Sequence, residues 1–131
     1  MERWFVKSFV NKQKQERLLF ELQKKRKEAI DRFAHSANEI LERRKMVFFG
    51  KKIQERDIEK QIEGVKQNKN KVYIISGNNK YDKKEIFYID ALRIFKEEYM
   101  PMIIICYNEY AIIKGETEGI SADVFIMKNN K

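Results

Sequence analysis

Few residues of this 131-residue chain have the type and spacing that catalysis requires. The single histidine, His35, would act as a base only if another part of the chain brought an acid or a nucleophile to it. Asp90, Glu109 and Lys114 are residue types of metal-dependent nucleases, but Glu109 and Lys114 would alternate to opposite faces of one strand. One histidine and one cysteine cannot hold zinc alone. We therefore predict no catalytic residue, no metal site and no cofactor.

The distribution of cations is the feature that indicates a function. The first 45 residues hold 13 Lys and Arg against 7 Asp and Glu, residues 46–70 hold 6 against 4, and residues 71–131 hold 9 against 9. The net charge of +8 therefore lies in the first half of the chain. A basic segment joined to a neutral one predicts an acidic partner, which is either a protein surface or a nucleic acid.

Particular residues of the first half are candidates for contact with this partner. The lysines between residues 12 and 45 that lack a glutamate four residues before them are Lys12, Lys14, Lys24, Lys27 and Lys45. On a helical projection Arg26 and Arg44 fall within the apolar stripe, where a guanidinium must reach water, pair with an acid of its own chain, or contact the partner. Leucines of the same stripe complete the set. The predicted partner-binding residues are Leu19, Leu22, Lys24, Arg26, Lys27, Arg44 and Lys45.

One long helix is expected to position these candidates. The segment from Lys14 to Lys45 lacks glycine and proline, and its apolar residues recur at helical spacing. Glutamates also stand four residues before cations, which is the favourable order for helix ion pairs. These pairs are Glu21–Lys25, Glu28–Arg32 and Glu39–Arg43.

The length of this helix leads to a prediction about its apolar stripe. At 1.5 Å per residue it would be about 45 Å long, whereas a typical strand spans about 17–20 Å. About half of the stripe, including Leu18, Leu19 and Leu22, would then overhang the sheet. We expect a partner or a second copy of the chain to cover it, rather than the first ten residues folding back.

The remainder of the sequence is typical of short strands with two short helices. Residues 46–50 are predicted as a turn or short strand ending at Gly50, and residues 57–67 as a helix capped by Asp57. A helix that starts at Asp90, its predicted N-cap, and runs to about Tyr99 should end before Pro101. The predicted strands are Val72–Ile75, Ile86–Ile89, Met102–Cys106, Tyr110–Lys114 and Asp123–Met127.

These elements define the expected fold class and organisation. The order after the helices is β-β-α-β-β-β, and a hairpin turn at Asn108 and Glu109 favours a mainly antiparallel sheet. The class is therefore α+β, with a basic helical arm at residues 1–70 and a neutral module at residues 71–131, which could also form one continuous domain.

The composition indicates a cellular compartment and a kind of source organism. The single cysteine, Cys106, lies in an apolar run and is expected to be buried; no intrachain disulfide can form, which indicates the cytoplasm. No segment is long and apolar enough to cross a membrane. Abundant Lys, Ile and Asn are typical of A/T-rich coding sequence, as in some bacteria and phages.

Packing in the core or at its edge is expected for the aromatic residues Tyr73, Phe87, Tyr88, Tyr107, Tyr110 and Phe125.

The function that these observations favour is binding rather than catalysis. We expect a non-enzymatic interaction protein whose basic helical arm engages an acidic protein or a nucleic acid, with self-association through the arm as a further possibility. Two alternatives stay open: a small nuclease or toxin with an unrecognised site, and an immunity or anti-defence factor of a mobile element.

Overall fold

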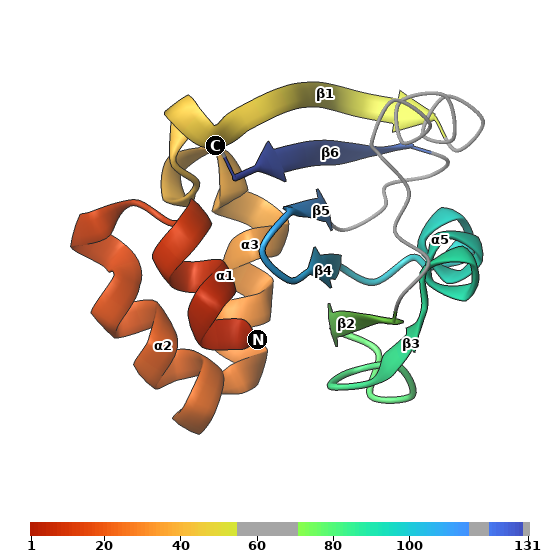
Figure 1. The fold of residues 1–131 in the computed structure, drawn as a ribbon, viewed down its shortest axis with the longest axis horizontal. Helices are drawn as coiled ribbons and strands as arrows, with labels where there is room; N and C mark the ends of the chain where they lie inside the picture. The colour runs from red at the N-terminus through yellow and green to blue at the C-terminus, as the bar shows by residue number, and fades with distance from the viewer. Residues whose placement is uncertain (55–70, 116–120, 130–131) are drawn as a thin grey trace.

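The structure, a computed structural model, describes residues 1–54, 71–115 and 121–129. Over these ranges it confirms the α+β class, with three helices on one face of a six-stranded sheet and one helix on the other (Figure 1). The helices and 3-10 turns are α1 (Glu2–Phe9), η1 (Lys12–Lys14), α2 (Gln15–Lys24), α3 (Arg26–Ile40), η2 (Arg43–Lys45) and α5 (Tyr88–Glu97). The strands are β1 (Met46–Gln54), β2 (Lys71–Ser76), β3 (Glu85–Phe87), β4 (Met102–Cys106), β5 (Tyr110–Lys114) and β6 (Ser121–Lys128).

The prediction of one continuous helix from Lys14 to Lys45 is wrong. Helix α2 ends at Lys24, Lys25 leaves the helical region with φ −137° and ψ 56°, and α3 begins at Arg26. The two helices pack against each other, and apolar residues of both enter one core. The physical reason is length: two shorter helices can both cover a sheet that a helix of about 45 Å would overhang.

The ion pair expected between Glu21 and Lys25 is also replaced. Lys25 closes α2 by donating its backbone N–H to the carbonyl of Glu21 at 2.7 Å, but its side chain is exposed. Glu21 is instead buried between two arginines, with its Oε2 atom 3.3 Å from Arg17 Nε and 2.6 Å from Arg32 Nη2. The second contact joins α2 to α3, so this carboxylate stabilises the helix pair rather than a single helix.

The first ten residues cover the stripe that was expected to need a partner. Phe5, Val6 and Phe9 of α1 are completely buried and share a core with Leu18 and Leu22. The predicted exposure of Leu18 and Leu22 is therefore wrong. The return is possible because η1 and a backbone bridge, rather than a long apolar linker, hold α1 beside the end of α3.

The sheet has the strand order β1-β6-β5-β4-β2-β3, and every neighbouring pair is antiparallel. The β4–β5 hairpin is confirmed, with Asn108 in the left-handed conformation at φ 67°. Strand β1 does not end at Gly50 but continues to Gln54, and its pairing with β6 is irregular between Gly50 and Ile53. The predicted helix at residues 57–67 and the boundary near residue 70 lie outside the described residues.

Helix α5 begins two residues earlier than predicted. Asp90 is not its N-cap; the helix starts at Tyr88, directly after the short strand β3. Asp90 lies in the first turn, where a carboxylate is stabilised by the helix dipole, and it accepts a hydrogen bond of 2.9 Å from Arg93. The helix ends at Glu97, before Pro101, as the proline requires.

The central strands β4 and β5 are buried on both faces of the sheet, which explains their unbroken apolar runs. In β4, Ile103 and Ile105 contact α1–α3, whereas Met102, Ile104 and Cys106 belong to the core beneath α5. Cys106 is a buried free thiol, as predicted. Across the described ranges, none of the helices combines the length and apolar character needed to cross a membrane.

Candidate functional site

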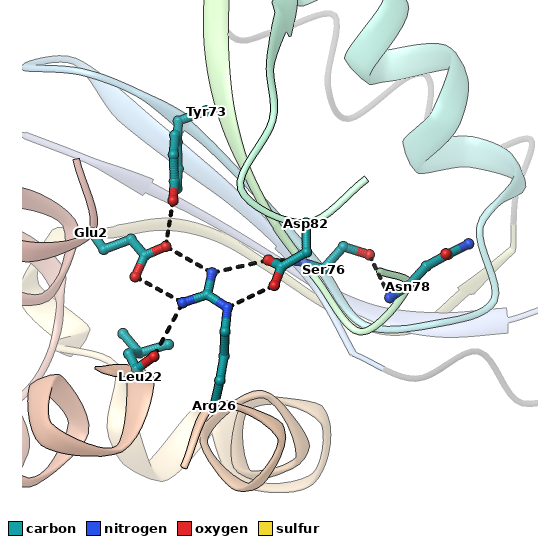
Figure 2. Close-up of polar contacts among 7 residues, drawn as sticks. All are labelled: Glu2, Leu22, Arg26, Tyr73, Ser76, Asn78 and Asp82. Carbon is teal, nitrogen blue, oxygen red and sulfur yellow. Dashed lines mark hydrogen bonds and ion pairs between the residues drawn. The ribbon is translucent and has the colours of Figure 1, made fainter. Parts of the chain in front are cut away.

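Arg26, a predicted partner residue, is held inside the chain between two carboxylates (Figure 2). Its Nη1 and Nη2 atoms donate to Glu2 over 2.9 and 2.7 Å, and Nε and Nη2 donate to Asp82 over 2.6 and 2.9 Å. Nη1 also donates to the carbonyl of Leu22 at 3.2 Å. A guanidinium has five N–H donors, so these five bonds leave none for an acidic partner.

The protonation states of this cluster follow from burial and from its hydrogen bonds. Burial would raise the pKa of Glu2, but hydrogen bonds from Arg26 and Tyr73 outweigh it and lower that pKa below its ordinary value of 4.5. Burial and the Glu2 carboxylate raise the pKa of the Tyr73 hydroxyl, which donates to Glu2 at 2.6 Å. Burial opposes the charge of Arg26, yet the bonds to Asp82 and Glu2 raise its pKa overall. At neutral pH Glu2 is therefore ionised and Tyr73 is neutral.

This arrangement connects elements rather than preparing a reaction. Glu2 lies in α1, Arg26 in α3, Tyr73 in β2 and Asp82 in the connection between β2 and β3. A lowered pKa makes Glu2 a poor proton donor at neutral pH, and Arg26 already occupies both carboxylates. The cluster thus acts as a polar clamp, defined here as Glu2, Arg26, Tyr73 and Asp82, between the helices and the sheet.

The other predicted partner residues do not form one surface. Lys24 and Lys27 are exposed beside the break between α2 and α3. Arg44 and Lys45 follow the opposite end of α3, which at 1.5 Å per residue is about 22 Å away. Of the two predicted leucines, Leu22 is buried in the core and Leu19 is half-buried against it.

The fold instead brings together two basic turns that are 30 residues apart in the sequence. Val10 and Leu41 form an isolated antiparallel bridge, and Glu42 N donates to Phe9 O over 2.8 Å. Asn11 donates from its backbone to Ile40 O at 2.8 Å and from its side chain to Glu39 O at 2.9 Å. As a result η1 and η2 flank one bridge at the same end of the helical layer.

This arrangement creates a surface that we call the basic end. Residues 11–14 and 41–45 carry one carboxylate, Glu42. It lies 3.6 Å from the highly exposed Arg44, and Lys45 donates to the side chain of Asn129 at 3.3 Å. Glu16 and Glu39 are the acids that stand closest to these two segments in the sequence. The basic end consists of Lys12, Lys14, Arg43, Arg44 and Lys45, and all except the half-buried Lys45 are exposed.

Sequence reasoning found only part of this surface. The sequence predicts partner contacts for Arg44 and Lys45. It leaves Lys12 and Lys14 as lysines without a glutamate four residues before them, and nothing in their spacing links the two turns. The missing information is the bridge between Val10 and Leu41, which is a long-range backbone contact. A continuous helix would have placed residues 14 and 45 at opposite ends, so the error in the helix concealed the site.

The residues considered for catalysis lie apart from one another. His35 is exposed on α3, and Asp90 is bound to Arg93 on α5. Glu109 and Lys114 stand at opposite ends of β5, on the order of 17 Å apart at the rise of a strand. In the part of the chain that the structure describes, no group of three His, Cys, Asp or Glu residues is placed to hold a metal ion.

Lys114 has a structural environment rather than a catalytic one. Its side chain is buried, and Nζ donates to the backbone carbonyls of Phe95 and Glu98 at the C-terminal end of α5. The ammonium group also lies 5.0 Å from the centre of the Phe95 ring. A cation at this position satisfies carbonyls that the helix leaves unpaired and complements the negative end of its dipole.

A small pocket opens beside α3 where β1 pairs with β6. Its volume is about 180 Å³, below the range of about 300–1,000 Å³ that is typical of small-molecule sites. Asp123 is its carboxylate, and this group accepts a hydrogen bond of 2.8 Å from the backbone of Lys52. The residues lining the pocket are Ala34, Lys51, Lys52, Gly115, Ser121, Ala122 and Asp123.

Comparison with known proteins adds no identification. No protein family, curated protein or solved structure matches this chain. Function is therefore inferred from the geometry and charge of the surfaces described above.

Proposed function

We propose that this chain is a non-enzymatic binding protein whose basic end engages an acidic partner. The observation that carries the proposal is the joining of η1 and η2 by the Val10–Leu41 bridge. Five cations and one carboxylate then share a surface, with four of the cations exposed. Such a concentration of like charge attracts phosphates or clustered carboxylates.

This proposal keeps the kind of partner expected from the sequence but changes the residues that contact it. Arg44 and Lys45 stay in the interface, and Lys12, Lys14 and Arg43 join them. Lys24 and Lys27 form a separate basic site at the other end of α3. Arg26 and Leu22 are excluded, because the first is bound by the polar clamp and the second is buried.

A structural role for the same cations must be separated from binding. The turns η1 and η2 follow the C-terminal ends of α1 and α3, where cations also stabilise the helix dipole by about 0.3–1 kcal/mol each. This contribution needs only the nearest charge at each helix end. The exposed side chain of Lys14 lies beyond it and is available to a partner.

Matched charge removal tests the proposal. The variant Lys12→Gln/Lys14→Gln/Arg43→Gln/Arg44→Gln removes four charges from the basic end. A control variant, Lys24→Gln/Lys27→Gln/Lys80→Gln/Lys84→Gln, removes four exposed charges elsewhere. Binding to fluorescent polyphosphate, poly-glutamate and oligodeoxynucleotides is measured by anisotropy at several salt concentrations, and folding is checked by thermal melting.

The expected result is selective. The basic-end variant should bind more weakly, with a salt slope flatter by about one per lost phosphate contact. The control should keep most of the wild-type affinity and slope. Equal losses in both variants would mean that only net charge matters, and the absence of binding to every polyanion would refute the proposal.

A further inference from the structure

An aromatic pair with one exposed ring, Tyr107 on Trp4, is connected to the basic end. Tyr107, in the turn between β4 and β5, is 51% exposed, although it was expected to pack in the core or at its edge. Its ring contacts Trp4 of α1 edge-on, with a centroid distance of 5.4 Å and an angle of 60°. Trp4 is half-buried and is held in turn by Phe9, at 5.3 Å and 84°. Trp4 therefore fixes Tyr107 in place while the tyrosine ring stays open to solvent.

Two series of contacts connect this pair to the basic end. On the helical side, Phe9 packs on Trp4 and its carbonyl binds the backbone of Glu42. On the sheet side, Asn129 N donates to the carbonyl of Glu109, in the turn that presents Tyr107, and the Asn129 side chain accepts from Lys45. Figure 1 shows this β4–β5 turn directed toward the helical layer.

Exposed cations also lie on the segments that carry or adjoin the aromatic pair. Arg3 and Lys7 precede and follow Trp4 on α1 and are exposed, and Lys128 is exposed opposite Tyr110 at the end of β6. Glu109 is the acid of the turn itself. The surface thus combines a solvent-facing ring with cations on neighbouring segments. An acidic protein surface would need the cations but not the ring.

We propose that the acidic partner is a single-stranded nucleic acid, with phosphates on the basic end and one base stacked on Tyr107. This inference rests on the proposed function and names its ligand class. Unpaired bases expose faces that stack on aromatic side chains, whereas the bases of a duplex are already stacked on each other. A single aromatic platform with flanking cations predicts binding with little preference among base sequences.

The test compares ligands that differ in one property at a time. Trp4 is the only tryptophan of the chain, so its fluorescence reports directly on a base arriving at Tyr107. The ligands are an oligothymidylate, an abasic deoxyribose-phosphate oligomer of the same length, a DNA duplex and poly-glutamate. Affinities of wild type, Tyr107→Ala and Tyr107→Phe are measured by anisotropy of labelled ligands.

The oligothymidylate should quench Trp4 and bind wild type about tenfold more tightly than the abasic oligomer, an effect in the range of one stacked base. Tyr107→Ala should remove that difference, and Tyr107→Phe should retain it because the ring remains. Equal affinity for the oligothymidylate and the abasic oligomer would overturn this inference and leave the proposed function intact. Tighter binding of poly-glutamate or duplex would also overturn it, and failure of all four ligands to bind would overturn both proposals.

Discussion

Arg26 and Asp82 are joined by two hydrogen bonds, of 2.6 and 2.9 Å, across 56 residues of sequence. The same carboxylate accepts a bond of 3.0 Å from the backbone of Ser76 at the end of β2. One guanidinium therefore fixes the start of α3 to the connection after β2, while its other edge holds Glu2 of α1. The polar clamp determines how the helical layer sits on the sheet.

We expect Arg26→Met to destabilise the fold strongly. The substitution keeps an unbranched side chain but leaves Glu2 and Asp82 without a cation, with only 21% and 11% of their side chains exposed. Removing one partner of a buried pair costs about 3 kcal/mol in the free energy of unfolding. Urea denaturation measures this. Arg93→Met is the control, because its pair with Asp90 is exposed and should contribute less than about 1 kcal/mol. Equal losses in the two variants would contradict the clamp.

The polar clamp also predicts a pH dependence. Folding lowers the pKa of Glu2 below 4.5, so its stabilising contribution is present above 4.5 and is lost as the pH falls through the lower value in the folded state. Between about pH 5 and pH 3 the free energy of unfolding of wild type should therefore fall more than that of Glu2→Gln, which cannot titrate there. Glu16→Gln controls for loss of one negative charge at the surface. Parallel profiles for wild type and Glu2→Gln would rule out this contribution.

A separate test asks whether α1 of the same chain buries the apolar stripe of α2. Leu22 is 3% exposed in a core shared with α1, whereas Phe20, two residues earlier, is 54% exposed. Leu22→Ala should cost about 2–5 kcal/mol in urea denaturation, because a cavity remains in packed surroundings. Phe20→Ala should change stability by less than about 0.5 kcal/mol. A small loss in the free energy of unfolding for Leu22→Ala would instead favour burial of this leucine by a partner.

The local elements of this fold could be predicted because their residues carry the information themselves. Asn108 accepts a positive φ in the β4–β5 turn, Pro101 lies beyond the end of α5, and Ile-rich runs form the strands. The break at Lys25 could not be predicted, because the apolar spacing from Leu22 to Ala29 is the same whether or not one residue leaves the helix. Only the finite width of the sheet favours the break, and that is a tertiary property.

The candidate site was less predictable than the fold for the same reason. The helical projection places Arg26 on an apolar face, where pairing with an acid of its own chain is one possible outcome, but Glu2 and Asp82 lie 24 and 56 residues away. Lys12 and Arg43 became neighbours through the backbone bridge of Val10 with Leu41. Tyr107 is exposed through its position in the turn between β4 and β5, which its residue type alone does not reveal.

A final prediction concerns two adjacent lysines of β1 that differ in backbone conformation. Lys52 has a φ of 53°, in the left-handed region, where the pairing of β1 with β6 becomes irregular. Its backbone N–H is held by Asp123 Oδ1 at 2.8 Å, and a residue with a Cβ atom pays about 1–2 kcal/mol there that glycine avoids. Lys52→Gly should therefore raise the free energy of unfolding by about 0.5–1 kcal/mol, after the greater entropy of glycine in the unfolded chain is subtracted.

Lys51→Gly is the control. It removes the same charge from a neighbouring strand position without relieving a positive φ, so it should lower the free energy of unfolding by about 0.5–1 kcal/mol. Thermal and urea denaturation of both variants measure the difference. Shifts of the same sign would show that the left-handed conformation of Lys52 carries no strain.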